Sequence, residues 1–371
     1  MIVTRVELQP CVMRKEDPNW RFALGANPVT DGVVVTLTAQ DGTQGFGYGS
    51  ATPHMGATRE TLLAALMRFV PLVAGRDSFA VEEILQALDV DLGGNNQAKA
   101  AIDCALHDLN ARILGVPLHQ LLGGKLRDSV PILRILAIKT PEEMSGQAQR
   151  LVDAGYRYLK IKVHGEVTDD VARVRAIRRQ VGDGVHLTID ANQSYSVKDA
   201  IAALNRMAEF AIDLAEQPVA AGDLKGLKLV TDSVAVTVEA DEAAASIADV
   251  MRLVSERIVD AISLKIPKLG GLRNTLAAAR ICEAGQIGYR MGAAVGSRLL
   301  SAQAMHLAAT LPRLDYACEL GEFDRLLDDP FEGIEIKNGC LALPRGVGSG
   351  VSPRARASGM ANARELKAVE S

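Results

Sequence analysis

The segment YLKIKV, residues 158–163, has the composition of a buried β-strand but contains two lysines. Its aromatic and branched residues favour a strand, and side chains alternate along a strand. Lys160 and Lys162 therefore point to the same face. A buried ammonium group is unfavourable unless a partner compensates its charge. The segment lies either on a solvated face or where the protein makes use of two buried cations.

Strand-like segments recur from about residue 130 onward, and helix-like segments separate them. Eight such units over roughly two hundred residues predict an α/β fold of the (β/α) TIM-barrel type. An open doubly wound sheet is the alternative, but no glycine-rich phosphate-binding sequence follows the first strand. The eight strand-like runs are VPILRILAI, YLKIKV, HLTIDA, IDLAEQP, AVTVEAD, AISLKI, GYRMGAAV and YACELG.

The N-terminal part of the chain has a different pattern. Residues 1–50 alternate as strands do, with a hairpin turn at Asp41–Gly42, and residues 58–122 are helix-like. Strands followed by a run of helices predict a separate α+β unit. We expect the tail, which begins near residue 346, to return to this unit or to be partly disordered.

Composition excludes several classes of function. The formal net charge is -4 and no basic run occurs, so neither nucleic acid nor an acidic membrane surface is an expected partner. No apolar run is long enough to span a membrane, and the N-terminus resembles a strand rather than a signal peptide. Five scattered cysteines favour reduced thiols and a cytoplasmic location.

Charged residues end five consecutive predicted barrel strands. They are Lys162, Asp190, Glu216, Asp241 and Lys265, with spacings of 28, 26, 25 and 24 residues. Each spacing is about one βα unit, so all five side chains should meet at the end of the barrel where such enzymes have their active sites.

The three carboxylates predict a metal site. Asp190, Glu216 and Asp241 would repel one another unless a cation lies between them. An all-oxygen site suits Mg²⁺, with Mn²⁺ as a second choice. The alternative is that each acid caps the following helix or forms a local ion pair.

The two lysines predict acid–base chemistry. Lys162 and Lys265 would approach from opposite sides of the barrel and reach both faces of a planar enediolate formed from a carboxylate substrate. A lysine must be neutral to accept a proton, and positive charge from Lys160 and the metal would lower its pKa. Lys160 is also expected to bind the substrate carboxylate. A solvated lysine pair is the alternative.

Together these motifs resemble the enolase superfamily, and within it the muconate lactonizing enzyme subgroup. The mandelate racemase subgroup fits less well, because it has a histidine after the seventh strand and GYRMGAAVGSR, residues 288–298, contains none. The resemblance rests on KIK at 160–162, DANQ at 190–193, EQP at 216–218, ADE at 240–242, LKIPKLGG at 264–271 and the helical segment at 98–124.

The resemblance implies an N-terminal α+β capping domain, residues 1–125, completed by the tail 346–371. It also implies a modified barrel over residues 126–345 and assembly as a homo-oligomer, either a dimer or an octamer. An essential Mg²⁺ would bind the three carboxylates, and Lys162 and Lys265 would form the acid–base pair.

Substrate-binding or supporting residues are expected around this centre. The loop with Trp20 and the end of the eighth strand should determine specificity, and we expect Lys268 to face the loop beyond its strand. Acidic residues near the pocket and the π face of Trp20 favour a substrate with a carboxylate and a cationic nitrogen. Glu322 and Asp324 are, alternatively, solvated loop residues. The full set is Trp20, Asn192, Lys268, Arg298 and Glu319.

The predicted function is a Mg²⁺-dependent racemase or epimerase that abstracts the proton α to a carboxylate. Its partner would be a small-molecule carboxylate, an amino acid or a derivative. A lactonizing cycloisomerase or a β-eliminating enzyme on the same site is the alternative. A metal-free Schiff-base aldolase would leave the three aligned carboxylates unexplained, and a non-catalytic scaffold would leave the lysine pair unexplained.

Overall fold

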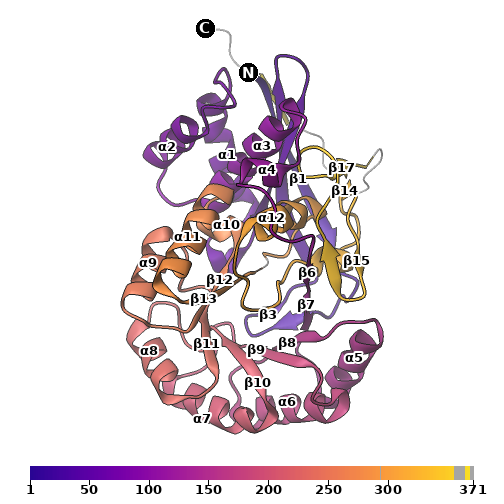
Figure 1. Cartoon of the computed structure of the whole chain (residues 1–371), viewed down its shortest axis with the longest axis vertical. Coiled ribbons are helices and arrows are strands. Elements are labelled where there is room, and N and C mark those ends of the chain that lie inside the picture. The colour runs from indigo at the N-terminus through magenta and orange to yellow at the C-terminus, as the bar shows by residue number, and fades with distance from the viewer. Residues whose placement is uncertain (293, 355–363, 368–371) are drawn as a thin grey trace.

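The computed structural model describes residues 1–292, 294–354 and 364–367. Figure 1 shows an α+β part that contains the N-terminus, and below it a curved parallel sheet with helices on its outer side. The predicted modified barrel with an N-terminal α+β part is confirmed.

The α+β part contains a four-stranded antiparallel sheet in the order β18-β1-β4-β5. The predicted turn joins β4 to β5, where the Thr43 amide donates to Asp41 Oδ1 at 2.9 Å and Gly42 adopts a φ of 86°. The strands are β1 (Val3–Arg14), β4 (Val29–Ala39), β5 (Gln44–Ala51) and β18 (Arg364–Lys367).

The helices α1 (Arg59–Val73) and α3 (Asn96–Ile113) pack on this sheet, α2 (Val81–Asp91) packs on α1 and α3, and α4 (Leu118–Leu121) packs on α3. The central helix, α3, contacts both β5 and the barrel helix α10 (Ile266–Leu269). Its Asp103 carboxylate accepts a hydrogen bond from the Leu272 amide. The two parts of the molecule are therefore joined through a buried helix.

The barrel sheet has seven parallel strands in the order β13-β12-β11-β10-β9-β8-β7. Its strands are buried on both faces because helices cover the outside and side chains fill the inside. They are β7 (Leu133–Leu136), β8 (Tyr158–Lys162), β9 (His186–Asp190), β10 (Ile212–Glu216), β11 (Thr237–Ala240), β12 (Ala261–Leu264) and β13 (Gly288–Met291).

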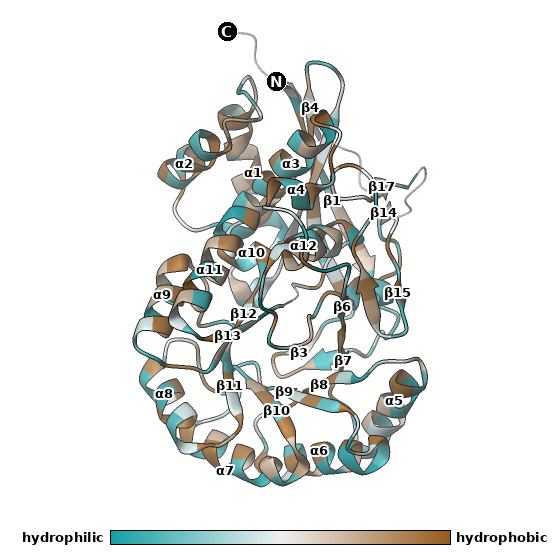
Figure 2. Cartoon of the chain, viewed as in Figure 1, coloured by the Kyte–Doolittle hydropathy of each residue, from teal (hydrophilic) through white to brown (hydrophobic). Residues whose placement is uncertain are grey.

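The outer helices expose hydrophilic residues and bury hydrophobic ones, as Figure 2 shows for α7 and α8, whereas α12 is buried along nearly its whole length. Polar residues start several of them. Thr140 Oγ1 accepts from the Glu143 amide at 3.3 Å, and the Glu143 carboxylate accepts from the Thr140 amide at 3.0 Å. The helices are α5 (Pro141–Asp153), α6 (Val167–Val181), α7 (Val197–Met207), α8 (Leu224–Ser233), α9 (Ile247–Ser255), α11 (Leu272–Gly285) and α12 (Arg298–Thr310).

The prediction of an eighth regular strand at YACELG, residues 316–321, is wrong. The segment is extended, and its backbone still bridges the two ends of the sheet. The Leu133 amide donates to the Cys318 carbonyl at 2.9 Å, and the Glu319 amide donates to the Met291 carbonyl at 2.8 Å. The chain then turns into η3 (Glu322–Arg325), which ends the pairing before a strand can form.

Short elements complete the described part of the chain. The tail contributes β17 and β18, while its residues 355–363 and 368–371 lie outside the described residues. The short elements are β2 (Arg21–Phe22), β3 (Gly25–Ala26), β6 (Ser129–Pro131), β14 (Phe331–Glu332), β15 (Ile336–Lys337), β16 (Cys340–Ala342), β17 (Ser352–Pro353), η1 (Pro53–Met55) and η2 (Ala208–Phe210).

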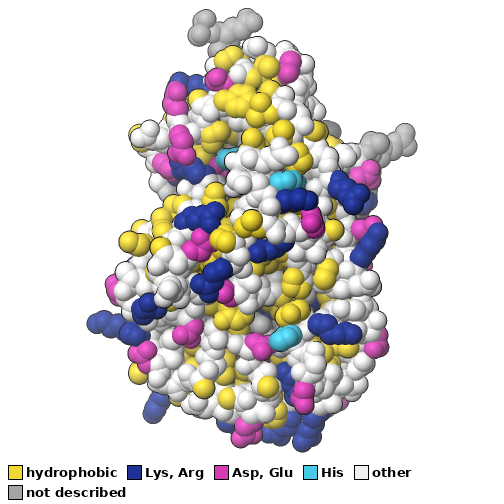
Figure 3. Space-filling model, viewed as in Figure 1, with side chains coloured by type: hydrophobic (Ala, Val, Ile, Leu, Met, Phe, Trp, Pro, Cys, Tyr) yellow, Lys and Arg dark blue, Asp and Glu magenta, His cyan; other side chains and the backbone are white. Residues whose placement is uncertain are grey.

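The surface carries mixed charge, and Figure 3 shows lysine and arginine interspersed with acidic residues over the face in view. Within the described ranges, every helix is too short or too polar to cross a membrane.

Gly47 allows β5 to lie directly against α3, because a methyl group there would overlap the Ala101 carbonyl. We expect Gly47→Ala to lower the free energy of unfolding by about 2 kcal/mol or more, since the helix backbone cannot move aside. Urea denaturation measures the change. Gly93→Ala is the control, because its methyl group meets no atom within 4 Å. Equal stability of the two variants would contradict the prediction.

Candidate active site

The charged residues predicted at the strand ends lie at one rim of the barrel. Lys162, Asp190 and Glu216 are the last residues of β8, β9 and β10, and they are direct neighbours in strand register. Asp241 follows β11 and Lys265 follows β12. All five side chains are buried. The solvated lysine pair considered above is therefore excluded.

Lys162 is held by the loop that follows β9. Its Nζ donates to Asp190 Oδ2 at 2.5 Å and to Asn192 Oδ1 at 2.8 Å. Asn192 adopts a φ of 41°, and its amide donates to Asp190 Oδ1 at 3.0 Å. The loop backbone thus places the Asn192 side chain beside the lysine.

Asp241 is bound by two lysines. Lys265 donates to its Oδ2, and Lys268 donates to its Oδ1 at 2.7 Å. Lys268 also donates to the Ser263 carbonyl at 2.9 Å and is buried, so the expectation that it faces the loop is wrong. The short helix α10 turns the chain back after Lys265 and directs Lys268 inward beneath the carboxylate.

Lys160 faces inward, as predicted, and lies among three carboxylates. Its Nζ is 3.0 Å from Asp190 Oδ2 and 2.9 Å from Glu216 Oε2, and it also pairs with Glu319. Burial lowers the pKa of Lys160, but the three carboxylates outweigh burial and raise it well above its usual value. Lys160 therefore remains a cation at the centre of the site.

Arg290 is a site residue that the sequence did not reveal. This fully buried residue of β13 donates from Nη2 to Glu216 Oε2 at 2.6 Å and to Glu239 Oε2 at 2.7 Å. A signal was available: Arg290 interrupts the apolar run GYRMGAAV, and Glu239 precedes Asp241 by two residues, on the same face of its strand. Charges within strands, and not only at strand ends, thus contribute to the site.

The two oxygens of Glu216 have different surroundings. Oε2 accepts from both Lys160 and Arg290, whereas Oε1 is buried, has no hydrogen-bond partner among the described residues and lies 3.9 Å from Lys265 Nζ. Burial and the neighbouring Asp190 raise the pKa of Glu216 to about 8, against the opposing effect of the two cations. A buried acceptor with no donor is the position at which a cation would be stabilised.

The residues fit a divalent metal by their chemistry. Asp190, Glu216 and Asp241 supply carboxylate oxygens from three adjacent strands, which hard cations such as Mg²⁺ prefer. In the described part of the chain, no three acidic, histidine or cysteine side chains form a ready-made metal cage. The lysine ammonium groups instead neutralise these carboxylates, so metal binding has to replace some of those ion pairs.

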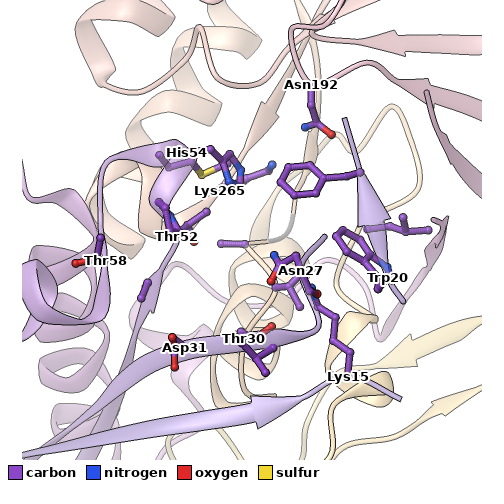
Figure 4. A pocket seen from close by; sticks show the side chains of 18 of the residues that line it. Lys15, Trp20, Asn27, Thr30, Asp31, Thr52, His54, Thr58, Asn192 and Lys265 are labelled. Carbon is purple, nitrogen blue, oxygen red and sulfur yellow. The ribbon is translucent and has the colours of Figure 1, made fainter. Parts of the chain in front are cut away.

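A cavity of about 300 Å³ lies above the charged rim, between the α+β part and the barrel. Lys160, Lys162, Lys265, Asn192 and Glu319 line it from the barrel side. Figure 4 shows residues of the α+β part, Lys15 and Trp20 among them, around the same space. This volume is at the lower end of the range for small-molecule sites.

The loop with Trp20 closes one side of the cavity. Phe22 lies 5.6 Å from Trp20 and 5.4 Å from His54, between ring centroids, and Lys162 Nζ lies 5.8 Å from the Phe22 centroid. Burial and then Lys265 lower the pKa of His54 to about 4, so this histidine is neutral near neutral pH.

The expected binding of a cationic nitrogen on the Trp20 face is not favoured, because Lys15 Nζ already lies 3.9 Å from the centroid of the Trp20 ring.

Three residues considered for substrate binding do not line the cavity. Arg298 pairs with Asp329 at 3.3 Å and lies over Phe323, away from the charged rim. Glu322 is buried, so it is not the solvated residue considered above, and it accepts from the Ile135 amide at 3.3 Å. Asp324 is exposed and pairs with Arg134 at 3.5 Å. The turn at 322–325 directs Glu322 and Asp324 away from the cavity.

Comparisons with known proteins identify the family. Residues 143–357 match the enolase C-terminal domain-like model, and residues 9–123 match the mandelate racemase/muconate lactonizing enzyme N-terminal domain. The chain belongs to the enolase superfamily. Within it, the relatives place the chain in the muconate lactonizing enzyme subgroup.

Members of this superfamily that resemble the chain include epimerases and cycloisomerases. The L-Ala-D/L-Glu epimerase of Clostridium acetobutylicum is 38% identical over 76% of this chain and 80% of its own. The chloromuconate cycloisomerase of Cupriavidus necator is 35% identical over 86% of this chain and 88% of its own. A dipeptide epimerase of Enterococcus faecalis, solved with Mg and L-Leu-L-Tyr, is 33% identical, covers 95% of this chain and 100% of its own, and has a TM-score of 0.91. The protein is an isomerase of the enolase superfamily.

Removing Arg290 should leave the buried carboxylates of Glu216 and Glu239 without its compensating positive charge. We expect Arg290→Met to lower the free energy of unfolding by about 3 to 5 kcal/mol, as measured by urea denaturation. The double variant Arg290→Met/Glu239→Leu should recover part of this loss, because Arg290 is the one ion-pair partner that Glu239 has among the described residues. A double variant no more stable than the single variant would contradict this account.

Metal affinity should depend on pH. Burial and the neighbouring Asp190 raise the pKa of Glu216, so a proton competes with a metal for this carboxylate at higher pH than it would for an ordinary glutamate. Affinity for Mg²⁺ should therefore increase from about pH 6 to about pH 8. Calorimetric titration at several pH values measures this dependence, in buffers of different ionisation enthalpy to count the protons released. A constant affinity with no proton release would contradict it.

Proposed function

We propose that this isomerase is a Mg²⁺-dependent racemase or epimerase that removes and returns the proton α to a carboxylate, on an amino acid derivative. The observation that carries the proposal is the pair Lys162 and Lys265. They come from β8 and from the residue after β12, and both line the same cavity. Two proton-transferring groups on separate strands suit a reaction that exchanges a proton between two faces of one carbon atom.

The metal would bind Asp190, Glu216 and Asp241. When bound, it would supply positive charge that stabilises the substrate carboxylate as the α-proton leaves. The Glu216 oxygen that lacks a hydrogen-bond partner supports this assignment. Magnesium in the dipeptide epimerase of Enterococcus faecalis supports the choice of ion.

The lysines must lose their protons before they act as bases. Burial lowers the pKa of Lys265, but Asp241, Glu216 and Glu319 raise it above its usual value overall. A carboxylate engaged as a metal ligand compensates the ammonium group less, and burial then favours the neutral amine. Asn192 keeps Lys162 oriented through its Oδ1, and Lys160 stays positive beside the reacting carboxylate.

A lactonizing cycloisomerase is the second candidate. Its support is the similarity to the chloromuconate cycloisomerase of Cupriavidus necator. Such a reaction requires proton transfer on one face only, so one of the two lysines would be dispensable.

Deuterium exchange in D₂O distinguishes the racemase or epimerase from the lactonizing cycloisomerase. The Mg²⁺-loaded protein is incubated with single enantiomers of amino acids, N-acyl amino acids and dipeptides, and with muconate. NMR and chiral chromatography follow the products. For a two-base racemase, Lys162→Ala and Lys265→Ala should each lower racemisation by about a hundredfold or more. Each variant should still exchange the α-proton of one enantiomer, and the two variants should differ in which one.

Lys337→Ala is the matched control, because this lysine is exposed on β15 and pairs with the exposed Glu335, away from the cavity. Its activity should equal that of the parent. Removal of Mg²⁺ with a chelator should abolish exchange, and re-addition should restore it. Formation of a lactone without loss of optical purity would overturn the racemase assignment in favour of the cycloisomerase.

A further inference from the structure

Arg290 is a fixed cation beside the proposed metal ligands. Its guanidinium bridges two carboxylates inside the barrel. Nη2 donates to Glu216 Oε2 at 2.6 Å and to Glu239 Oε2 at 2.7 Å, and Nε donates to Glu239 Oε1 at 3.0 Å. A planar guanidinium that meets one carboxylate through two of its nitrogen atoms is held in one orientation. Glu239 therefore fixes the direction from which Arg290 approaches Glu216.

Glu216 differs from the other two proposed metal ligands in the cations that it meets. The other two pair with Lys162 and Lys265, which both line the cavity. Flexible lysine side chains can move aside when a metal binds. Arg290 is not among the described residues that line the cavity, and its second carboxylate holds it in place. It therefore stays beside Glu216 whether or not a metal is bound.

One oxygen of Glu216 is fully used within the protein. A carboxylate oxygen has two lone pairs that accept hydrogen bonds. Oε2 accepts from Arg290 Nη2 at 2.6 Å and from Lys160 Nζ at 2.9 Å, so both of its lone pairs are occupied. Oε1 is buried, and within the described ranges no hydrogen bond reaches it. Glu216 therefore has a single oxygen left for a metal.

The number of available carboxylate oxygens distinguishes Mg²⁺ from Ca²⁺. Ca²⁺ is the larger ion, takes about six to eight oxygen ligands and accepts both oxygens of one carboxylate, whereas Mg²⁺ requires a near-octahedral set. We propose that Arg290 is a positioning residue that makes the site selective for Mg²⁺ over Ca²⁺, because it withholds Oε2 of Glu216. This inference rests on the proposed function, since it takes Asp190, Glu216 and Asp241 to be the metal ligands.

Lys160 cannot withhold this oxygen alone. Its Nζ is shared among three carboxylates, at 3.0 Å from Asp190 Oδ2 and 2.9 Å from Glu216 Oε2, with Glu319 as the third. A lysine ammonium group is a point charge on a flexible stem, so it can turn toward its other partners. Loss of Arg290 should therefore make Oε2 available to the larger ion.

A charge-neutral double variant tests the proposal. Arg290→Met/Glu239→Leu removes one cation and one anion, so the net charge around the site is unchanged. Calorimetry measures Mg²⁺ binding, and displacement of Mg²⁺ by Ca²⁺ gives the affinity of Ca²⁺ for the same site. We expect the affinity for Mg²⁺ to fall about tenfold to a hundredfold and that for Ca²⁺ to stay nearly constant. An unchanged ratio of the two affinities in the folded double variant would overturn the proposal.

Lys228→Met/Asp232→Leu is the matched control, because it makes the same kind of replacement at an exposed ion pair of 3.0 Å on α8. Both of its metal affinities should equal those of the parent. If Arg290→Met/Glu239→Leu does not fold in a thermal melt, Arg290→Gln/Glu239→Gln replaces it and is judged by the same ratio.

The parent protein provides a second measurement that requires no variant. It should bind Mg²⁺ about tenfold or more tightly than Ca²⁺, because Glu216 offers the larger ion one oxygen instead of two. Equal affinities of the parent for the two ions would overturn the proposal.

Failure of this inference and failure of the proposed function give different results. If Mg²⁺ binds and supports racemisation, but the ratio of affinities does not depend on Arg290, the inference fails and the racemase stands. If the ratio depends on Arg290 but no α-proton exchanges on any substrate, the selectivity role stands and the racemase fails.

Discussion

The carboxylate of Glu216, between two buried cations, is the interaction on which the interior of the barrel depends. Lys160 and Arg290 both donate to one of its oxygens, which leaves the other oxygen available. Ionised groups are tolerated inside the barrel because each carboxylate from the three adjacent strands β9, β10 and β11 is paired with a lysine or arginine. The same pairing keeps the proposed metal ligands and the proposed bases in contact, so that binding at one affects the protonation of the other.

The cavity belongs to neither part of the molecule alone. The barrel supplies the charged rim, and the α+β part supplies the loop with Trp20 and the cation Lys15. Helix α3 fixes the relative position of the two parts, because it contacts both β5 and α10. The residues for the chemistry thus come from the barrel, and the residues for substrate selectivity come from the α+β part. Selectivity can therefore change while the charged rim stays the same.

The sequence predicted the barrel and the position of its charged rim because the spacing of βα units determines which residues end the strands. It did not predict that residues 316–321 would close the sheet without forming a strand, since that depends on the turn that follows. Arg290 was missed because only strand ends were considered. The position of Arg298 and the cation at Lys15 depend on packing between distant segments, which local periodicity does not encode.

The pairing of β18 with β1 has a consequence for biosynthesis. Residues 364–367 form an edge strand beside residues 5–8, near the other end of the chain. During translation, the hairpin of β4 and β5 is made early, but the outer edge of β1 stays open until residues 364–367 have left the ribosome. An open edge invites pairing with other chains. Truncation before residue 364 would leave that edge exposed permanently, so a shortened form should be prone to aggregate even with an intact barrel.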